Sequence, residues 1–233
     1  MKTNINYSPG RRGAVLVRRS LGAGGFPLIA TLGLLLAVAP RAFAADATPT
    51  AAAAVTDPQT ILKQAVDEVL GVAYAAPTTP PADPLVTRLR PVLEKYFSFE
   101  LITRSAVGPG WSSFKSAEQQ RTITLFTDLV IRTYSDKFEP GDRPKVTYGK
   151  PVEIDDTNRR ELPTTITYAG KNYAVSYRLR LLPEGWRIYD VNIEGVSMVA
   201  NYRAQFDPLF QKGGAAAIIA ALEKNLADFA AKK

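Results

Sequence analysis

The sequence contains neither histidine nor cysteine among its 233 residues. Without histidine, the chain cannot build a Ser–His–Asp or a Cys–His catalytic centre. The two side chains that most often bind zinc are also missing, so we expect no metal site and no cofactor. Without cysteine, no disulfide can form, and the fold must be stabilised by its hydrophobic core. These absences exclude the commonest nucleophilic and zinc-dependent hydrolases.

Acidic residues are missing from the first 44 positions, although the whole chain has 22 of them. The same 44 positions hold six basic residues: Lys2, Arg11, Arg12, Arg18, Arg19 and Arg41. The formal net charge of the chain is +7, but the rest of it has 23 basic against 22 acidic residues. Because the body is nearly neutral, the composition does not support a protein that grips nucleic acid.

This basic leader has the layout of an export signal. An apolar run, FPLIATLGLLLAVA at 26–39, follows the basic segment, and the small-x-small triplet AFA comes next. The run is shorter than the ~20 residues that span a bilayer, which favours a cleaved signal over a retained anchor. We therefore predict a signal peptide over 1–44, a flexible tether over 45–56 and a single domain over 57–233 of an exported protein.

The first half of the predicted domain repeats apolar residues at helical spacing. Asp57 and Pro58 suit the N-cap and the first helical position of one helix. A second helix is predicted from Asp83–Pro84, and a third from Ser116, where Gln119 suggests a capping box. The apolar stripe of the third helix consists of Ile123, Phe126, Leu129, Val130, Tyr134 and Phe138.

Beyond residue 145 the apolar period changes from 3.6 to 2. The alternation predicts four strands, over Val146–Ile154, around Ile166–Tyr168, over Tyr173–Leu181 and over Trp186–Ile193, joined by hairpin-sized turns. A C-terminal helix follows from about Gly214. The predicted fold class is thus α+β, with N-terminal helices, a four-stranded antiparallel curved sheet and C-terminal helices.

The predicted sheet has one apolar face and one polar, solvent-exposed face. The odd positions of its third strand are apolar from Tyr173 to Leu181, whereas the even ones include Ser176, Arg178 and Arg180. Several tyrosines fall on these strands, and each phenol needs a hydrogen-bond partner or a wet edge. Two interpretations stay open from the pattern alone: an apolar hollow, or an ordinary sealed core with tyrosines at its rim.

Asp190 and Glu194 are the obvious candidates for acid–base chemistry. In an extended strand they would lie about 13 Å apart, too far for either usual glycosidase geometry. Alternation places Asp190 on one face with Trp186 and Ile188, opposite Tyr189, Val191 and Ile193. We interpret both carboxylates as structural, holding backbone or arginine partners at a bend, with Arg187 and Arg203 as candidates. Ser197 then caps the helix that follows the bend. We therefore predict no catalytic residue.

Three segments carry a resemblance to a known family. GWRIYDVNIEGVSMVANYRAQF (185–206) closely resembles the signature of the MlaC family of periplasmic phospholipid-binding proteins, also called toluene-tolerance auxiliary proteins. LEKYFSFELITRSAVGPGW (93–111) and AEQQRTITLFTDLVIRTYSDKF (117–138) agree in order. The resemblance covers about residues 57 to 230, and the hopanoid-associated HpnM branch belongs to the same family.

The resemblance implies a half-cone fold whose sheet and helices enclose an apolar cavity for lipid tails. It also implies a periplasmic shuttle without covalent chemistry. Such a shuttle carries phospholipid, or a hopanoid-type lipid, between an outer-membrane lipoprotein complex and an inner-membrane ABC transporter with MCE domains. The sequence leaves the oligomeric state open, and we take a monomer as the default. The residues predicted to bind the lipid are Phe126, Val130, Tyr134, Val146, Tyr148, Ile166, Tyr168, Tyr173, Val175, Tyr177, Leu179, Tyr189, Val191, Ile193, Val196 and Met198.

Two other classes of function remain to be weighed against lipid carriage. A cavity enzyme of the isomerase or hydratase type could use Asp190 as a base and Tyr168 or Tyr177 to stabilise an oxyanion. A scaffold that bridges envelope proteins would need neither a ligand nor a hollow. The position of Asp190 relative to the apolar face discriminates the enzyme from the carrier.

Overall fold

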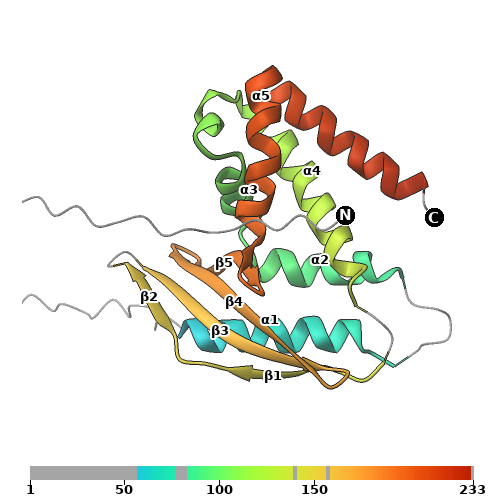
Figure 1. Cartoon of the computed structure of the whole chain (residues 1–233), viewed down its shortest axis with the longest axis vertical. Helices are drawn as coiled ribbons and strands as arrows, with labels where there is room; N and C mark the ends of the chain where they lie inside the picture. Colours follow the sequence, from blue (N-terminus) through green and yellow to red (C-terminus); the bar gives the residue numbers. More distant parts are fainter. Residues whose placement is uncertain (1–56, 77–82, 139–140, 156–157, 232–233) are drawn as a thin grey trace, which may run out of the picture. The chain divides into compact units, whose positions relative to one another are not determined.

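The structure is a computed structural model that describes residues 57–76, 83–138, 141–155 and 158–231. The predicted signal peptide and tether lie outside the described residues. The elements described below all belong to one compact unit, Pro49–Lys233. Figure 1 shows them as a sheet accompanied by helices. Among the described helices, none combines the length and the hydropathy needed to cross a bilayer.

The chain order is helical first, then β, then helical again. The elements are α1 (Pro58–Ala73), α2 (Leu85–Tyr96), α3 (Phe99–Val107), the 3-10 helix η1 (Gly108–Ser113), α4 (Ser116–Ser135), β1 (Lys145–Tyr148), β2 (Val152–Asp155), β3 (Arg159–Tyr168), β4 (Lys171–Leu182), β5 (Gly185–Ile193), β6 (Val196–Ser197) and α5 (Met198–Ala231). The predicted α+β class is confirmed.

Capping residues explain most helix starts. The Asp57 carboxylate accepts from the backbone N–H of Thr60 at 3.0 Å, and Pro58 is the first helical residue. Asp83 is not the N-cap of α2, which begins after Pro84 without a side-chain cap. At α4 the capping-box carboxylate is Glu118, not Gln119: its Oε2 accepts from the backbone N–H of Lys115 at 2.8 Å.

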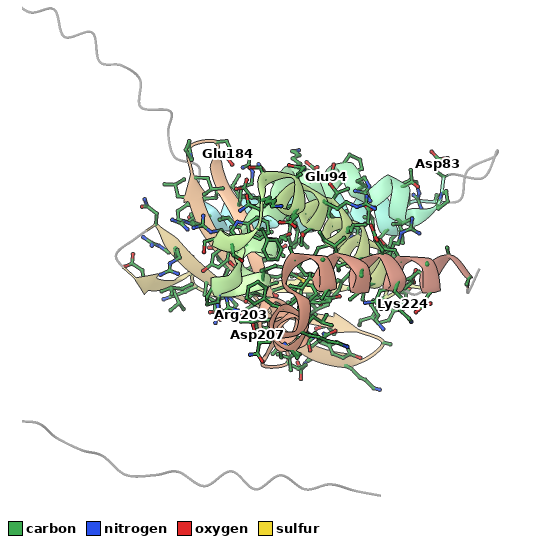
Figure 2. All side chains as sticks on the ribbon, turned by 90° about the horizontal axis from the view of Figure 1, so that it is seen from above. Asp83, Glu94, Glu184, Arg203, Asp207 and Lys224 are labelled. Atoms are coloured by element: carbon green, nitrogen blue, oxygen red, sulfur yellow. The ribbon has the colours of Figure 1, made fainter. Side chains whose placement is uncertain are left out.

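Helix α5 consists of two limbs joined at Gly213–Gly214. Gly214 has φ +58°, a left-handed conformation that side chains disfavour, and both glycines depart from helical geometry. Figure 2 shows the change of direction, with Asp207 on the first limb and Lys224 on the second. The sequence predicted a C-terminal helix beginning at about Gly214. That residue is the kink, and the second limb of α5 begins there.

The sheet has six strands rather than the four predicted. Its order is β1-β3-β4-β5-β6, and β2 pairs with β3 beside β1. The first predicted strand is divided because Gly149 and Pro151 interrupt it: Val146 pairs with Ile166, whereas Val152 pairs with Glu161. Proline cannot donate to a ladder, and Gly149 lies so close to β3 that a Cβ there would be 2.9 Å from Pro163 Cγ.

A β-bulge at Tyr189 overturns the predicted alternation on β5. Arg178 pairs with Asp190, but the next residue, Leu179, pairs with Ile188, which leaves Tyr189 without an opposite residue. Because a bulge shifts the facing of everything beyond it, Ile188 lies on the same face as Val191 rather than opposite it. The apolar face of the sheet is therefore continuous across the bulge.

Two hydrophobic cores hold the structure together. The sheet core packs α1 and α2 on the apolar face of the sheet, with Leu62 and Ala65 against Leu179 and Ile188. The helix core joins α3, α4 and both limbs of α5. Phe97 packs against both cores. The helix core meets the sheet at β5, whose edge accepts a hydrogen bond at Ile188 from the backbone of Ser98.

Candidate functional site

The apolar face of β4 is exposed at the first residues of the strand and buried at its middle. Tyr173 is 38% exposed, Val175 is 6% exposed and Leu179 is fully buried under α1. Their cross-strand neighbours lie on the same face, since directly paired residues share a face. These neighbours are Ile166, Thr164 and Arg160 on β3, with Ile193 and Ile188 on β5. An apolar strip thus runs from an open end of the sheet to a sealed end.

Two tyrosines line the inner part of this strip. Tyr148 and Tyr177 pack against the sheet core. Burial raises the pKa of Tyr148 to about 12, and the Asp67 carboxylate adds to the shift while Arg143 opposes it. Burial likewise raises the pKa of Tyr177. Both phenols therefore stay neutral at physiological pH, so neither supplies a charge to this face.

The structure distributes the predicted lipid-binding residues over three places. Four belong to or pack on the helix core: Phe126, Val130, Tyr134 and Met198. Four belong to or pack on the sheet core: Tyr148, Tyr177, Leu179 and Val191. The others lie toward the open end of the apolar face, apart from Tyr189 at the bulge: Val146, Ile166, Tyr168, Tyr173, Val175, Ile193 and Val196.

The sheet and helix-core groups therefore do not form one continuous lining. The sequence pattern also missed Leu162 and Ile188, which are fully buried on the apolar face beside Leu179. Ile188 was assigned to the opposite face because a bulge leaves no signal in alternation counted residue by residue. Leu162 precedes Pro163, which interrupts the pattern expected of a strand.

Asp190 is a structural residue at the corner between β5 and α5. It is 3% exposed, and its carboxylate accepts from Ser197 Oγ at 2.6 Å and from the backbone N–H of Val199 at 3.1 Å. Ser197 Oγ in turn accepts from the N–H of Ala200. The α5 N-terminus is thus capped twice, by Ser197 as predicted and by a carboxylate from the neighbouring strand.

The predicted arginine partners of Asp190 were wrong. Its cation is Arg178, at 3.4 Å, whereas Arg203 donates to the carbonyl of Ser105 and Arg187 to that of Trp186. Alternation could not reveal this, because the bulge brings Asp190 opposite Arg178. Arg178 also binds Glu161, whose pKa is lowered chiefly by the hydroxyl of Ser176 and further by this guanidinium.

Asp190 and Arg178 share the polar face of the sheet, away from Tyr177 and Leu179. A base for proton abstraction has to reach the substrate in the apolar space. All the hydrogen bonds that the structure gives the Asp190 carboxylate hold the protein's own backbone and side chains. These contacts show Asp190 as a cap of α5.

Two pockets lie among the helices. One, of about 330 Å³, is lined by Arg90, Glu94, Phe97, Phe99, Gln120, Ile123, Thr124 and Thr127. The other, of about 250 Å³, is lined by Leu129, Tyr202, Gln205, Asn225, Asp228 and Phe229. Neither contains a predicted lipid-binding residue. The space expected to be hollow is, at its inner end, filled by Leu62 and Ala65 of α1.

Three buried polar atoms in the described part of the chain lack a hydrogen-bond partner: Arg132 Nε, Ser135 Oγ and Trp186 Nε1. Arg132 and Ser135 lie one turn apart near the end of α4, and Trp186 is on the apolar face of β5 beside Leu181. Buried polar atoms are nearly always paired, so each marks a place that water or a ligand atom would satisfy. The residues that the structure describes contain no group of three or more acidic side chains placed to hold a metal ion.

The comparisons with known proteins agree with the fold and with the sequence signature. A family model described as MlaC protein matches residues 63–224. The chain belongs to the MlaC family. A solved structure from Ralstonia solanacearum, described as a phospholipid-binding protein in complex with a phospholipid, is 27% identical, with a TM-score of 0.66. The match covers 75% of this chain and 99% of that chain. A search of curated proteins gave no match.

Proposed function

We propose that this MlaC-family protein binds a phospholipid-class lipid by its acyl chains and carries it through the periplasm without covalent chemistry. The observation that supports this most is the apolar strip on the sheet, open at Tyr173 and sealed at Leu179. In a protein with a closed core, we would expect this apolar face to be covered along its whole length. The phospholipid in the Ralstonia relative supports the same class of ligand.

The size of a diacyl lipid determines how much apolar surface the protein must shield from water. A diacyl lipid carries on the order of 30 methylenes, and leaving them in water would cost roughly 24 kcal/mol at ~0.8 kcal/mol each. Pockets of 250 to 330 Å³ lie at the lower end of ordinary ligand sites. Since Leu62 and Ala65 of α1 occupy the inner end of the apolar face, the tails would enter there as α1 moves away from the sheet and would replace these side chains on Leu179.

The contacts of α1 are compatible with such a movement. Its polar links to the rest of the molecule include the ion pairs Glu68–Lys95, at 2.6 Å, and Asp67–Arg143, at 3.7 Å. Both pairs are largely exposed, and exposed pairs contribute about 0 to 1 kcal/mol each. Most of the energy holding α1 is therefore apolar burial, which an acyl chain can replace.

Location and partners complete the proposal. Residues 1–44 would direct export and be removed, and residues 45–56 would tether the domain. The partners would be an inner-membrane ABC transporter complex with MCE domains and an outer-membrane lipoprotein complex. A hopanoid-type lipid is the alternative cargo. The nearly neutral body, with 23 basic against 22 acidic residues beyond position 44, suits a shuttle that must leave each membrane after contact.

The test is to extract the purified protein with organic solvent and to identify the bound molecule by mass spectrometry. Ile166→Lys places a charge on the half-buried apolar face, whereas Thr165→Lys places it on the exposed opposite face of the same strand. We expect wild type and Thr165→Lys to carry lipid and Ile166→Lys to lose it, with all three folded by circular dichroism. A wild-type protein free of lipid, or equal loading in both variants, would contradict the proposal.

The enzyme and scaffold alternatives have their own outcomes in this experiment. An isomerase or hydratase using Asp190 is disfavoured, because that carboxylate caps α5 on the polar face. An envelope scaffold predicts no bound lipid in any of the three proteins, together with an unchanged envelope phenotype for Ile166→Lys.

A further inference from the structure

Five large hydrophobic side chains are well exposed among the described residues, and they fall at opposite ends of the sheet. Val152 and Ile154 lie on β2, which pairs with the beginning of β3. Tyr173, Ile193 and Val196 lie at the other end. There Val196 pairs with Ile193, and Tyr173 is the residue of β4 two positions before the partner of Ile193. This second group, Tyr173, Ile193 and Val196, is called the apolar rim below.

The apolar rim is framed by two tight turns. Ala169–Gly170 joins β3 to β4, and Glu194–Gly195 joins β5 to β6, all four with positive φ. Two-residue turns of this conformation match the twist of the flanking strands and form compact, well-defined hairpins. The Glu194 backbone N–H donates to the Ala174 carbonyl at 2.8 Å, which fixes the second turn to β4. The rim is thus presented on a defined edge.

The rim continues the strip of the proposed lipid site. All three side chains lie on the apolar face, and Val175, the partner of Ile193, is buried directly behind them. A lipid tail moving along this face would leave the protein between Tyr173 and Ile193. Further along the strip, Leu179 and Ile188 are covered by α1 and α2.

Charges around the rim favour an anionic surface. Lys145 and Lys171 are exposed at this end of the sheet, and neither forms an ion pair with another described residue. The carboxylate of Glu194, in the turn beside the rim, accepts a hydrogen bond from the backbone N–H of Ala174. This end of the sheet therefore carries the apolar rim together with two lysines that form no ion pair within the described part of the chain.

We propose that the apolar rim is the portal for lipid and that it contacts an anionic bilayer surface directly during uptake and release. This deepens the proposed function and rests on it. The three exposed side chains of the rim form a small apolar patch. They suit shallow, reversible insertion, where tyrosine prefers the interfacial region and lysine interacts with anionic headgroups.

The experiment measures transfer of fluorescent phosphatidylethanolamine from vesicles to the full mature protein. The donor vesicles contain phosphatidylcholine with or without phosphatidylglycerol. Val196→Glu alters the rim, and Val152→Glu makes the same change at a site of similar exposure, 55% against 61%, on the opposite end of the sheet. Val196→Thr removes the apolar group without adding a charge or lowering strand propensity, and circular dichroism checks each fold.

We expect Val196→Glu to slow the transfer about tenfold, the effect of losing one inserted valine, with Val196→Thr intermediate. Val152→Glu should transfer lipid at the wild-type rate. Lys171→Glu should slow transfer about fivefold from vesicles containing phosphatidylglycerol only, and high salt should abolish this difference. Equal rates for Val196→Glu and Val152→Glu would overturn the assignment of the portal.

Two outcomes separate this proposal from the function on which it rests. Wild-type protein that contains co-purified lipid but exchanges it with no vesicle would overturn direct membrane contact and point to a protein partner at the rim. Wild-type protein that neither contains nor takes up lipid would overturn the proposed function itself.

Discussion

Replacing Asp190 tests the assignment of this buried carboxylate to the α5 cap. In Asp190→Ala, the N–H of Val199 and the hydroxyl of Ser197 lose their charged acceptor, and Arg178 keeps only Glu161. Hydrogen bonds to a charged group contribute about 1.5 to 3 kcal/mol, and a lost N-cap costs about 1 kcal/mol. We expect a destabilisation of about 3 to 4 kcal/mol.

The assay is thermal and urea unfolding monitored by circular dichroism. A domain of this size loses about 2 to 4 °C of Tm per kcal/mol, so Asp190→Ala should melt roughly 6 to 16 °C below wild type. Asp190→Asn keeps two acceptor lone pairs and should lose about half as much stability. Asp207→Ala is the control, because Asp207 is exposed on the first limb of α5 and has no side-chain bond to another described residue (Figure 2).

A loss below 1 kcal/mol in Asp190→Ala would refute the capping role. Lipid content gives an independent reading of the same variants. Asp190→Asn should still carry lipid, because Asp190 lies on the polar face of the sheet. If Asp190→Asn folds normally but no longer turns over a small molecule that the wild type converts, the result would support an enzyme that uses Asp190.

Two further predictions concern the strands. Arg180 and Arg187 are directly paired and have like charges, so Arg180→Glu should raise stability by about 0.5 to 1 kcal/mol at low salt and less at high salt; an unchanged Tm at low salt would contradict this. The pKa of Tyr148, raised to about 12 from an unfolded value near 10, gives stability that is complete below pH 10 and is lost as the pH rises toward 12. Tyr148→Phe should therefore show a shallower alkaline decline in urea unfolding free energy, and an identical decline would exclude this phenol as a cause.

Local signals in the sequence predicted those parts of the fold that depend on local contacts. Asp57 and Ser197 cap helices as expected, because a cap needs only the next three residues. The change from period 3.6 to period 2 marked the passage from helices to sheet. The recognition of the family from residues 185–206 was likewise confirmed, because the signature is local.

The sequence could not predict which residues of different strands pair with one another. The division of the first strand at Gly149–Pro151 and the bulge at Tyr189 depend on which residues of β3 and β4 lie opposite. The bulge moved Ile188 onto the apolar face and gave Asp190 a different arginine. The helix stripe containing Phe126 was assigned to the lipid site for the same reason: periodicity shows that a face is buried, but not against what.

Within the described residues, Phe97 is the one side chain that packs on both cores, so few contacts join them. A protein arranged in this way need not open as one cooperative unit. Amide protons of α4 and α5 can stay protected from exchange while those of α1 and the sheet beneath it exchange through partial openings. The helix core would then stay folded throughout. The packing of α1 on the sheet would become fully ordered only when a ligand is bound.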